Sequence, residues 1–473
     1  MKEEDIMELV NIINGYLWSY VLIGLLLISG IFYTIRTGFA QIFLFGDMVR
    51  LVTGKLSALK DGEKREGHQV SAFQAFCISV SSHVGTGNLA GVAIAVVLGG
   101  PGALFWMWVT SLIGCATSLI ENTLAQVYKE HDGKGGYRGG PAYYMEKALG
   151  WKSMAKFFSV IVIITFAFAF NTVQANTIAQ AFEGSFGFSP MLVGVVITIL
   201  SALVIFGGLQ RIANFAGLVV PVMALGYVIV ALIVLLMNIP HIPALIVLIV
   251  KSAFGVQAMA GGAMGVAMLQ GVKRGLYSNE AGMGSAPNAA ATSKVSHPVK
   301  QGLLQAFGVF IDTIVICSAT GFIVLLLPNY ANIGETGIKL TQIALSREVG
   351  AWGSPFITAC LFLFAFSSVI GNYYYGETNV EFLSGGNKQV MLLFRIISVA
   401  IIYIGSVAKL STVWDLADLS MGIMAIMNIV AIAILSPKAL HVLQDYRAKR
   451  REGKNPEFYI KDTPEIMNTE TWE

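Results

Sequence analysis

Charged residues are scarce in this chain. They make up 12% of its 473 residues, about half the share found in an ordinary soluble domain, and this excludes a soluble fold for most of the length. The net charge of +3 comes from short segments between apolar runs and gives no sign of a nucleic-acid partner. Apolar stretches of about 20 residues recur from Gly15 to Ser436, and each is long enough to cross a lipid bilayer.

Cysteine and histidine are also rare. The four cysteines, Cys77, Cys115, Cys317 and Cys360, lie inside apolar segments without the spacing of metal ligands, so we interpret them as reduced core residues. His83 lies among serines, but no second histidine, carboxylate pair or metal motif joins it at depth, which argues against a membrane enzyme. No continuous polar stripe that could line a channel is visible either.

The apolar pattern predicts an all-α integral membrane protein with eleven transmembrane helices. The stretch Phe39–Val52 is shorter and carries Asp47 and Arg50, so we expect an amphipathic helix at the membrane surface there. The expected spans are 16–34, 69–97, 102–127, 156–182, 190–206, 213–237, 247–271, 299–327, 352–375, 389–408 and 412–436.

Lysine and arginine collect in alternate loops, after the first, third, fifth and seventh expected spans and in the C-terminal tail. Two of the loops between them, Glu183–Pro190 and Asn238–Pro243, contain neither residue. Because basic loops stay in the cytoplasm, this alternation predicts a multi-pass protein of the cell membrane with its N-terminus outside and its C-terminus in the cytoplasm.

Two apolar spans are interrupted by small and polar residues, at Ser79–Gly91 (SVSSHVGTGNLAG) and at Gln257–Gly265 (QAMAGGAMG). An unwound backbone is tolerated in a membrane only where it lines a cavity or is buried in protein. Paired interruptions in two halves of a chain indicate a transporter's binding site. We therefore expect residues 1–68 to hold an extra helix and the amphipathic segment, 69–237 and 238–436 to be two five-helix repeats of opposite orientation, and 437–473 to be a cytoplasmic tail.

The first interruption offers two helix ends. The half that begins near Thr86 presents free amide donors suited to a carboxylate, and the half that ends near Val84 presents carbonyl oxygens suited to a cation. Close helix packing through Gly87 and Gly91 is the alternative interpretation. No arginine lies near either interruption, which favours a small neutral zwitterion over a dicarboxylate, a cationic amino acid or a phosphate.

Ionisable residues inside the expected spans are candidates for function. Asp312 lies midway along the eighth span and is either a cation or proton site or a packing residue paired with Thr313. His83 either titrates or serves as a neutral hydrogen-bonding group. For Glu121 we favour a structural or gating role. Gln210-Arg211 and Arg274 with Glu280 lie on the expected cytoplasmic side, where a salt bridge could close the inner mouth, but most such loop charges are simply solvated and we single out none of them.

Three segments resemble the alanine or glycine:cation symporter family. They are Gly99–Gly114 (GGPGALFWMWVTSLIG), Tyr137–Met145 (YRGGPAYYM) and Gly275–Pro287 (GLYSNEAGMGSAP), and the resemblance covers essentially the whole chain. It implies a sodium/alanine symporter related to the LeuT-fold transporters, with a LeuT-like 5+5 inverted repeat plus one extra N-terminal helix.

The resemblance also implies a site, because Val84-Gly85-Thr86-Gly87-Asn88 is similar to the Val-Gly-Leu-Gly-Asn of the wider fold. It implies that a sodium ion is held by carbonyls of Ser81, Val84 and Phe364 and by hydroxyls of Ser367 and Ser368, with Asp312 and Asn88 as a further cation pair. The implied substrate-binding residues are Thr86, Gly87, Asn88, Phe168, Asn171, Gly261, Gly262, Ala263 and Met264.

The expected function is secondary active symport, in which inward flow of a cation, sodium first, drives uptake of alanine or glycine. A proton-coupled transporter using Asp312 or His83 is the alternative. Sodium is then cargo that travels with the amino acid. A small pocket discriminates weakly against one added group, so serine is a further candidate substrate. Nothing in the sequence indicates an oligomeric state.

Overall fold

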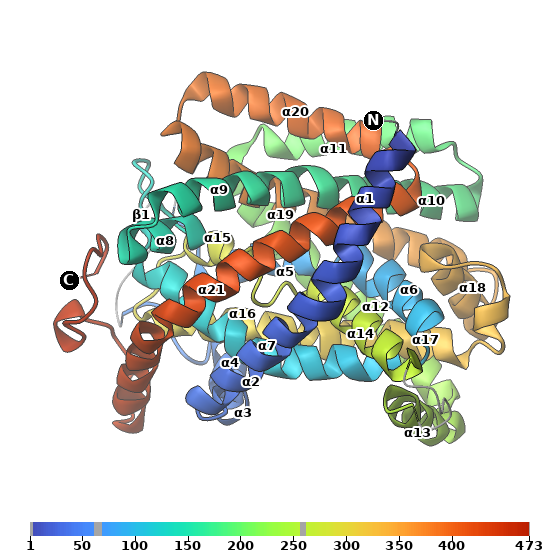
Figure 1. The fold of residues 1–473 in the computed structure, drawn as a ribbon, viewed down its shortest axis with the longest axis horizontal. Helices are drawn as coiled ribbons and strands as arrows, with labels where there is room; N and C mark the ends of the chain where they lie inside the picture. Colours follow the sequence, from blue (N-terminus) through green and yellow to red (C-terminus); the bar gives the residue numbers. More distant parts are fainter. Residues whose placement is uncertain (1–2, 61–68, 256–261, 473) are drawn as a thin grey trace.

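The computed structural model describes residues 3–60, 69–255 and 262–472, which are folded almost entirely as helices (Figure 1). Within these ranges the one sheet is a short antiparallel pair, β1 (Glu130–His131) with β2 (Tyr137–Arg138). The expected all-α class is confirmed.

The N-terminal span consists of α1 (Glu3–Tyr16), a π-helical segment η1 (Leu17–Leu22) and α2 (Ile23–Arg36). It crosses α21 (Leu410–Arg451), as Figure 1 shows, and Trp18 donates from its ring nitrogen to the carbonyl of Asp418 on that helix, at 3.2 Å. The short helices α3 (Ala40–Phe43) and α4 (Phe45–Val52) follow in place of the single expected surface helix.

The next helices lie in the range 69–237, where the first repeat is expected. Helix α5 (Ala72–His83) is followed by η2 (Gly87–Gly91) and α6 (Val92–Gly99), with a bend of 43° between the two halves. The rest, in order, are α7 (Gly102–Val127), α8 (Pro141–Leu149), α9 (Lys152–Val162), η3 (Ile163–Phe170), α10 (Asn171–Phe186), α11 (Pro190–Ile205) and α12 (Gly208–Met237).

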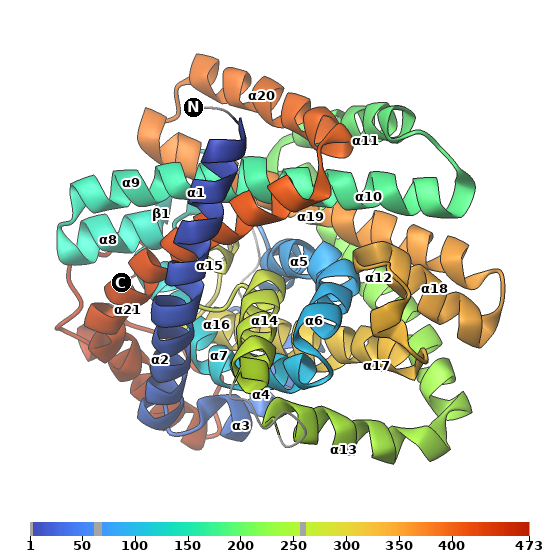
Figure 2. The same ribbon diagram turned by 45° about the vertical axis from the view of Figure 1, so that its right-hand side comes forward.

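The second group of helices begins after a short turn, η4 (Ile239–His241). Its members are α13 (Ile242–Ala253), α14 (Gly262–Asn279), α15 (Ala286–Ala290), α16 (Pro298–Phe310), η5 (Ile311–Cys317), α17 (Ser318–Leu326), η6 (Tyr330–Asn332), α18 (Gly337–Val349), α19 (Gly353–Ser384), α20 (Lys388–Val407), α21 and η7 (Ile460–Asp462). Figure 2 shows α5, α6 and α14 together in the middle of the molecule, where α14 contacts both η2 and α6.

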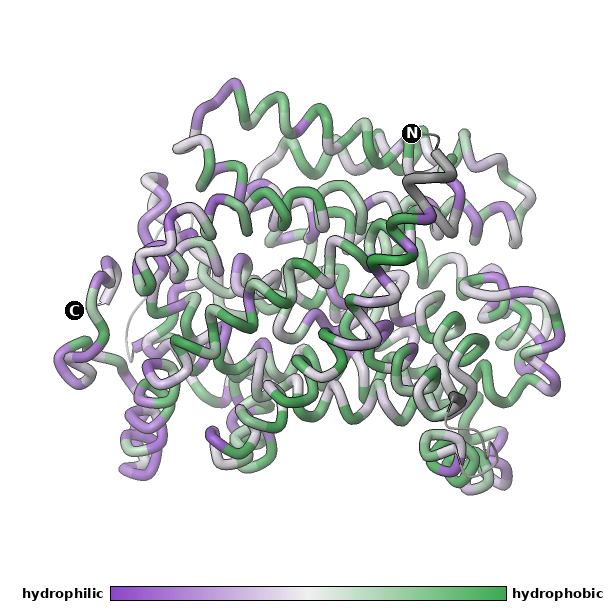
Figure 3. Tube along the Cα trace, in the orientation of Figure 1, coloured by the Kyte–Doolittle hydropathy of each residue, from purple (hydrophilic) through white to green (hydrophobic). Residues whose placement is uncertain are grey.

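Eight of the described helices are long and apolar enough to cross a membrane, and the bent pair α5–α6 makes a ninth. Helix α11, at 16 residues, is shorter than these spans but coincides with an expected one. The single span expected over 247–271 is instead divided between α13 and α14. A count of eleven is compatible with this arrangement. Along the chain, hydrophobic residues dominate the long helices and hydrophilic ones gather at the C-terminal end of α21 (Figure 3).

The segment after α21 returns to pack on loops from earlier parts of the chain. Asn455 donates to the carbonyl of Leu59 at 2.9 Å, and the amide of Phe458 donates to the carbonyl of Ser296 at 2.8 Å. Further on, the ring nitrogen of Trp472 donates to the carbonyl of Gln126, also at 2.9 Å. The segment thus packs on two loops and on the C-terminal end of α7.

Candidate functional site

Helix α5 is built to stop in the interior. Its first turn is closed by a capping box between Ser71 and Gln74, and it ends at Val84 and Gly85. The side-chain oxygen of Asn88 accepts from the amide of Gly85 at 2.9 Å, which satisfies a backbone donor at the break, just before the second half-helix begins. A β-carbon at Gly85 would lie 2.4 Å from the hydroxyl oxygen of Ser368, so only glycine permits this approach of α5 to α19.

Oxygen atoms converge where α5 meets α19. The hydroxyl oxygen of Ser368 lies 2.7 Å from the carbonyl of Ser81, 3.0 Å from that of Phe364 and 3.4 Å from that of Val84. A serine hydroxyl has one proton and can satisfy only one of these acceptors fully. Carbonyls at the C-terminal end of a half-helix are typical ligands of a co-transported cation. The structure therefore brings four of the five expected sodium ligands together.

Ser367, the fifth expected ligand, lies at the edge of the same cluster. Its hydroxyl donates to the carbonyl of Phe364 at 2.8 Å and lies 3.6 Å from the sulfur of Met223 on α12. It therefore shares one ligand atom with the cluster while its hydroxyl is directed towards α12.

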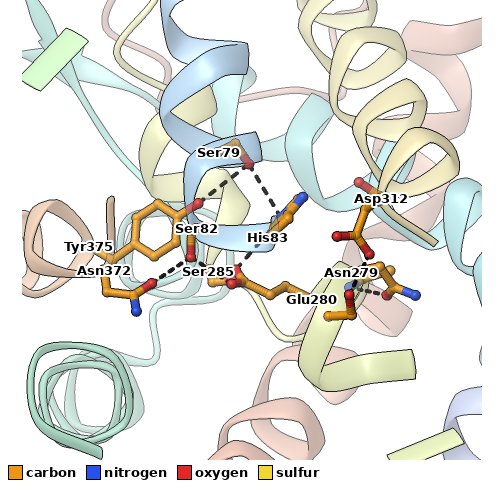
Figure 4. A network of polar contacts seen from close by, with 12 residues as sticks. Ser79, Ser82, His83, Asn279, Glu280, Ser285, Asp312, Asn372 and Tyr375 are labelled. Carbon is orange, nitrogen blue, oxygen red and sulfur yellow. Dashed lines mark hydrogen bonds and ion pairs between the residues drawn. The ribbon is translucent and has the colours of Figure 1, made fainter. Parts of the chain in front are cut away.

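Asp312, in η5, ties the first break to α14 (Figure 4). Its carboxylate accepts from the side-chain nitrogen of Asn88 at 2.7 Å, from Ser278 at 2.8 Å and from Thr313 at 2.9 Å. The expected contact with Thr313 is present, and Asn88 is a partner as well. Among the described residues no lysine or arginine pairs with Asp312, so its charge is met by neutral donors alone.

The amide of Thr86 begins the second half of the broken helix. It donates to the side-chain oxygen of Gln174 on α10 at 3.0 Å, and the Thr86 hydroxyl lies 3.3 Å from that of Tyr277. At Gly87 a β-carbon would lie 3.1 Å from the Tyr277 ring, so α14 packs directly on this half. Sequence reasoning missed Gln174, although a glutamine within an apolar span was a visible signal.

Asn171 and Phe168 lie on the same stretch of chain as Gln174. The side chain of Asn171 is buried, and neither its oxygen nor its nitrogen has a hydrogen-bond partner among the described residues. Such groups are rare in folded proteins and need an explanation; a polar ligand supplies one. Phe168 is half-buried, while the neighbouring Phe170 packs on Tyr277 with 4.5 Å between ring centroids.

Only residues 262–265 of the second expected interruption are described, and they are helical. Gly261 is outside the described residues, and Gly262, Ala263 and Met264 form the first turn of α14, where the Met264 side chain is 40% exposed. At about 1.5 Å per residue, Met264 is roughly 20 Å along the helix from Tyr277, which contacts the first break. The expectation that this stretch faces the first break is therefore wrong for its described part.

The break that does face the first one is Glu280–Ser285, between α14 and α15. Gly282 and Gly284 have φ values of +88° and +78°, a conformation that favours glycine. The carboxylate of Glu121 on α7 accepts from the amides of Gly282 at 3.0 Å and Gly284 at 3.1 Å, and from Asn428 at 2.7 Å. These contacts replace the helical hydrogen bonds lost at the break and agree with the structural role favoured for Glu121.

Arg274 has a partner other than Glu280. It pairs with both carboxylate oxygens of Asp418, at 3.1 and 2.8 Å, and Lys273 adds a third contact at 2.6 Å. The guanidinium also lies 4.4 Å from the centroid of the Trp414 ring. These residues belong to α14 and α21 rather than to a loop, and the salt bridge of Arg274 in the described structure is with Asp418. Trp414 in turn packs on Tyr277, with 4.7 Å between the ring centroids.

At the opposite end of the molecule, where α12 begins and α19 ends, there is a cleft of about 820 Å³. Its lining includes two ion pairs, Arg138 with Glu381 at 3.2 Å and Arg395 with Glu377 at 2.7 Å. The lining of this cleft includes none of the expected site residues.

One broken helix that contributes carbonyls to a cation-type oxygen cluster, with a second broken helix in contact with it, is typical of a secondary transporter of the LeuT fold. The structure is similar to the crystal structure of MhsT in complex with L-phenylalanine, with a TM-score of 0.57 and 12% sequence identity, over 80% of this chain and 99% of that one. The chain belongs to the sodium:alanine symporter family, whose model matches residues 3–460.

Relatives within the family carry several names. A probable sodium/glutamine symporter, GlnT of Bacillus subtilis, is 50% identical and covers 99% of this chain and 97% of its own. A putative sodium/proton-dependent alanine carrier, YrbD of the same organism, is 42% identical, with 98% and 97% covered. The sodium/alanine symporter AgcS of Methanococcus maripaludis is 39% identical, with 95% and 100% covered. Family and fold are those of cation-coupled amino-acid symporters.

Proposed function

We propose that this protein couples inward flow of sodium to uptake of alanine or glycine by alternating access. The observation that carries the proposal is the cluster around Ser368, in which carbonyls of Ser81, Val84 and Phe364 lie within 3.4 Å of one hydroxyl. It joins α5 to α19, so a cation bound there would hold the two helices together. Loss of the cation would leave three acceptors sharing one proton and would favour separation of the helices.

The choice of sodium follows from the ligand types. Every oxygen in the cluster is neutral, whereas sites for divalent cations usually include carboxylates. A monovalent ion therefore suits this cluster. The names of the relatives include both sodium-dependent and sodium/proton-dependent carriers, which keeps proton coupling as the alternative for this chain.

The choice of a small zwitterion follows from the surroundings of Thr86. Its amide stands at the start of a half-helix, where a carboxylate is favoured, and in the described structure it is bonded to Gln174. An incoming carboxylate would take the place of the Gln174 oxygen. Tyr277 packs between Phe170 and Trp414, at centroid distances of 4.5 and 4.7 Å, which restricts the space left for a substrate side chain.

Glutamine is the second candidate substrate. The relative with 50% identity is named for glutamine, and Asn171 offers a buried amide with no partner for its oxygen or nitrogen. A substrate carboxamide has the matching donor and acceptor. Under this proposal alanine and glutamine share the Thr86 end of the site and differ in contact with Asn171.

The test is uptake of labelled alanine into proteoliposomes under an inward sodium gradient, with potassium or choline as replacement. Sodium-dependent accumulation is expected, and unlabelled alanine, glycine, serine and glutamine should then be ranked as competitors. Equal uptake with potassium would contradict sodium coupling. Cysteine labelling of the two termini in intact cells tests the expected orientation, with the N-terminus outside and the tail in the cytoplasm.

A further inference from the structure

Glu280 links the two breaks directly. It is the first residue after α14, it is buried, and its φ of +55° is unusual for a residue with a side chain. One carboxyl oxygen lies 2.6 Å from the hydroxyl of Ser82 in the last turn of α5, and the other lies 2.5 Å from that of Ser285 before α15 (Figure 4). A strained backbone and two short contacts thus hold this carboxyl between both half-helices.

Among the described residues, the groups that face Glu280 include one that can carry a positive charge. His83 of α5 lies 3.7 Å away and has no partner on its second ring nitrogen. The other titratable groups are Glu121 of α7, Asp312 of η5, Tyr277 of α14 and Tyr375 of α19. No lysine or arginine of the described chain pairs with Glu280. Ionisation of a carboxyl group in such surroundings is unfavourable in free energy, and uptake of a proton removes this penalty.

The hydrogen bonds around Ser82 depend on that proton. Its hydroxyl oxygen lies 2.6 Å from Glu280 and also 2.6 Å from the side-chain oxygen of Asn372 on α19. With Glu280 ionised, Ser82 donates to the carboxylate, and the Asn372 oxygen has no donor. With Glu280 protonated, the acid donates to Ser82, and Ser82 donates to Asn372. Binding of one proton to Glu280 therefore switches the hydrogen bond that Ser82 donates from Glu280 to Asn372 on α19.

We propose that Glu280 is a proton-binding residue, and that a proton there competes with the cation bound at the Ser81–Ser368 cluster. Ser82 follows Ser81, and Asn372 lies one helical turn beyond Ser368. Ionised Glu280 places a negative charge beside the cluster and favours the cation, whereas the proton, which comes from water and returns to it, removes that charge. This inference rests on the proposed sodium coupling, and it assigns proton sensitivity to Glu280 in place of Asp312 or His83.

The main test is sodium activation of alanine uptake in proteoliposomes at several values between about pH 5.5 and 8.5. The half-saturating sodium concentration of the wild type is expected to rise as the pH falls, by up to about tenfold per pH unit in the competitive limit. Glu280→Gln keeps both hydrogen bonds without the titration, so its sodium requirement should be raised and independent of pH. Glu280→Asp should restore pH dependence with a shifted midpoint.

Two further variants separate Glu280 from its surroundings. His83→Asn removes the neighbouring titratable group and should leave pH dependence in place. Glu452→Gln neutralises an exposed carboxylate in the segment after α21 and should behave as wild type. The proposal is overturned if Glu280→Gln keeps the pH dependence of the wild type, or if His83→Asn alone abolishes it.

A direct measurement covers the case in which a variant does not fold. Purified wild-type protein in weakly buffered detergent should release protons when sodium chloride is added, and choline chloride should release none. Sodium binding without proton release overturns the role of Glu280 while leaving sodium coupling intact. Absence of sodium-dependent uptake in the wild type would instead contradict the proposed function.

Discussion

Removal of the Ser368 hydroxyl is the sharpest test of the cation cluster. This hydroxyl is the one group within 3.4 Å of all three carbonyls, from Ser81, Val84 and Phe364. Ser368→Ala deletes a cation ligand and leaves the carbonyl of Ser81 without the donor that lies 2.7 Å away. A polar contact to a charged partner is worth about 1.5–3 kcal/mol. At about 1.4 kcal/mol per factor of ten, the half-saturating sodium concentration should rise roughly 10- to 100-fold.

The assay is the initial rate of alanine uptake into proteoliposomes as external sodium is varied, with total salt held constant by choline. The rate at saturating sodium should change much less than the sodium requirement, because the substitution acts on cation binding. Ser367→Ala should give a smaller rise, since its hydroxyl is directed towards Met223.

Ser354→Ala is the matched control for Ser368→Ala. Ser354 is in the first turn of α19, where its hydroxyl contacts that of Ser185 at 2.6 Å, roughly 20 Å along the helix from Ser368. Its sodium requirement should equal that of the wild type. An unchanged requirement in Ser368→Ala, or an equal rise in Ser354→Ala, would refute the reasoning.

Three more predictions concern residues around the breaks and the loops. Asn88→Ala leaves the Gly85 amide and one Asp312 oxygen without their partners, which costs about 1–3 kcal/mol each; transport should be largely lost and the melting temperature in detergent lowered. Glu121→Gln has one acceptor oxygen where three donors converge, so thermal stability should fall. A melting curve like that of the wild type would contradict the stabilising role of these Glu121 contacts. The pKa of His297 is lowered to about 4 because burial outweighs its contact with Asp445. The unfolded chain takes up this proton near pH 6.5, so stability should decline as pH falls from about 6.5 towards 4, and by less in His297→Gln.

The first break could be predicted because its signal is local. A histidine, serines and glycines interrupt an apolar span at Ser79–Gly91, and such a pattern has few explanations in a membrane. The resemblance to a known family then supplied partners from α19, about 280 residues away. Without it, nothing in the sequence connects Ser81 to Ser368, because the contact arises only from helix packing.

The second break was misplaced for a physical reason. The run Gln257–Gly265 is rich in glycine and apolar residues, and this composition suits a helix end as well as a helix interruption. The real break, Glu280–Ser285, depends on the carboxylate of Glu121, 161 residues earlier in the chain. Hydrogen bonds over such separations leave no periodic trace in a sequence, and the Ser82–Glu280 contact was missed for the same reason.

Because the last segment packs on parts of the chain that are made much earlier, these contacts can form only late in synthesis. Trp472 is bonded to the carbonyl of Gln126, 346 residues earlier. At about 5–20 residues per second, a ribosome needs roughly 20–70 s to make the chain between them. During that interval the chain at the end of α7 lacks its contact with Trp472 and stays accessible to chaperones and proteases. Assembly at this end of the molecule therefore finishes after the helices that form the site have been made.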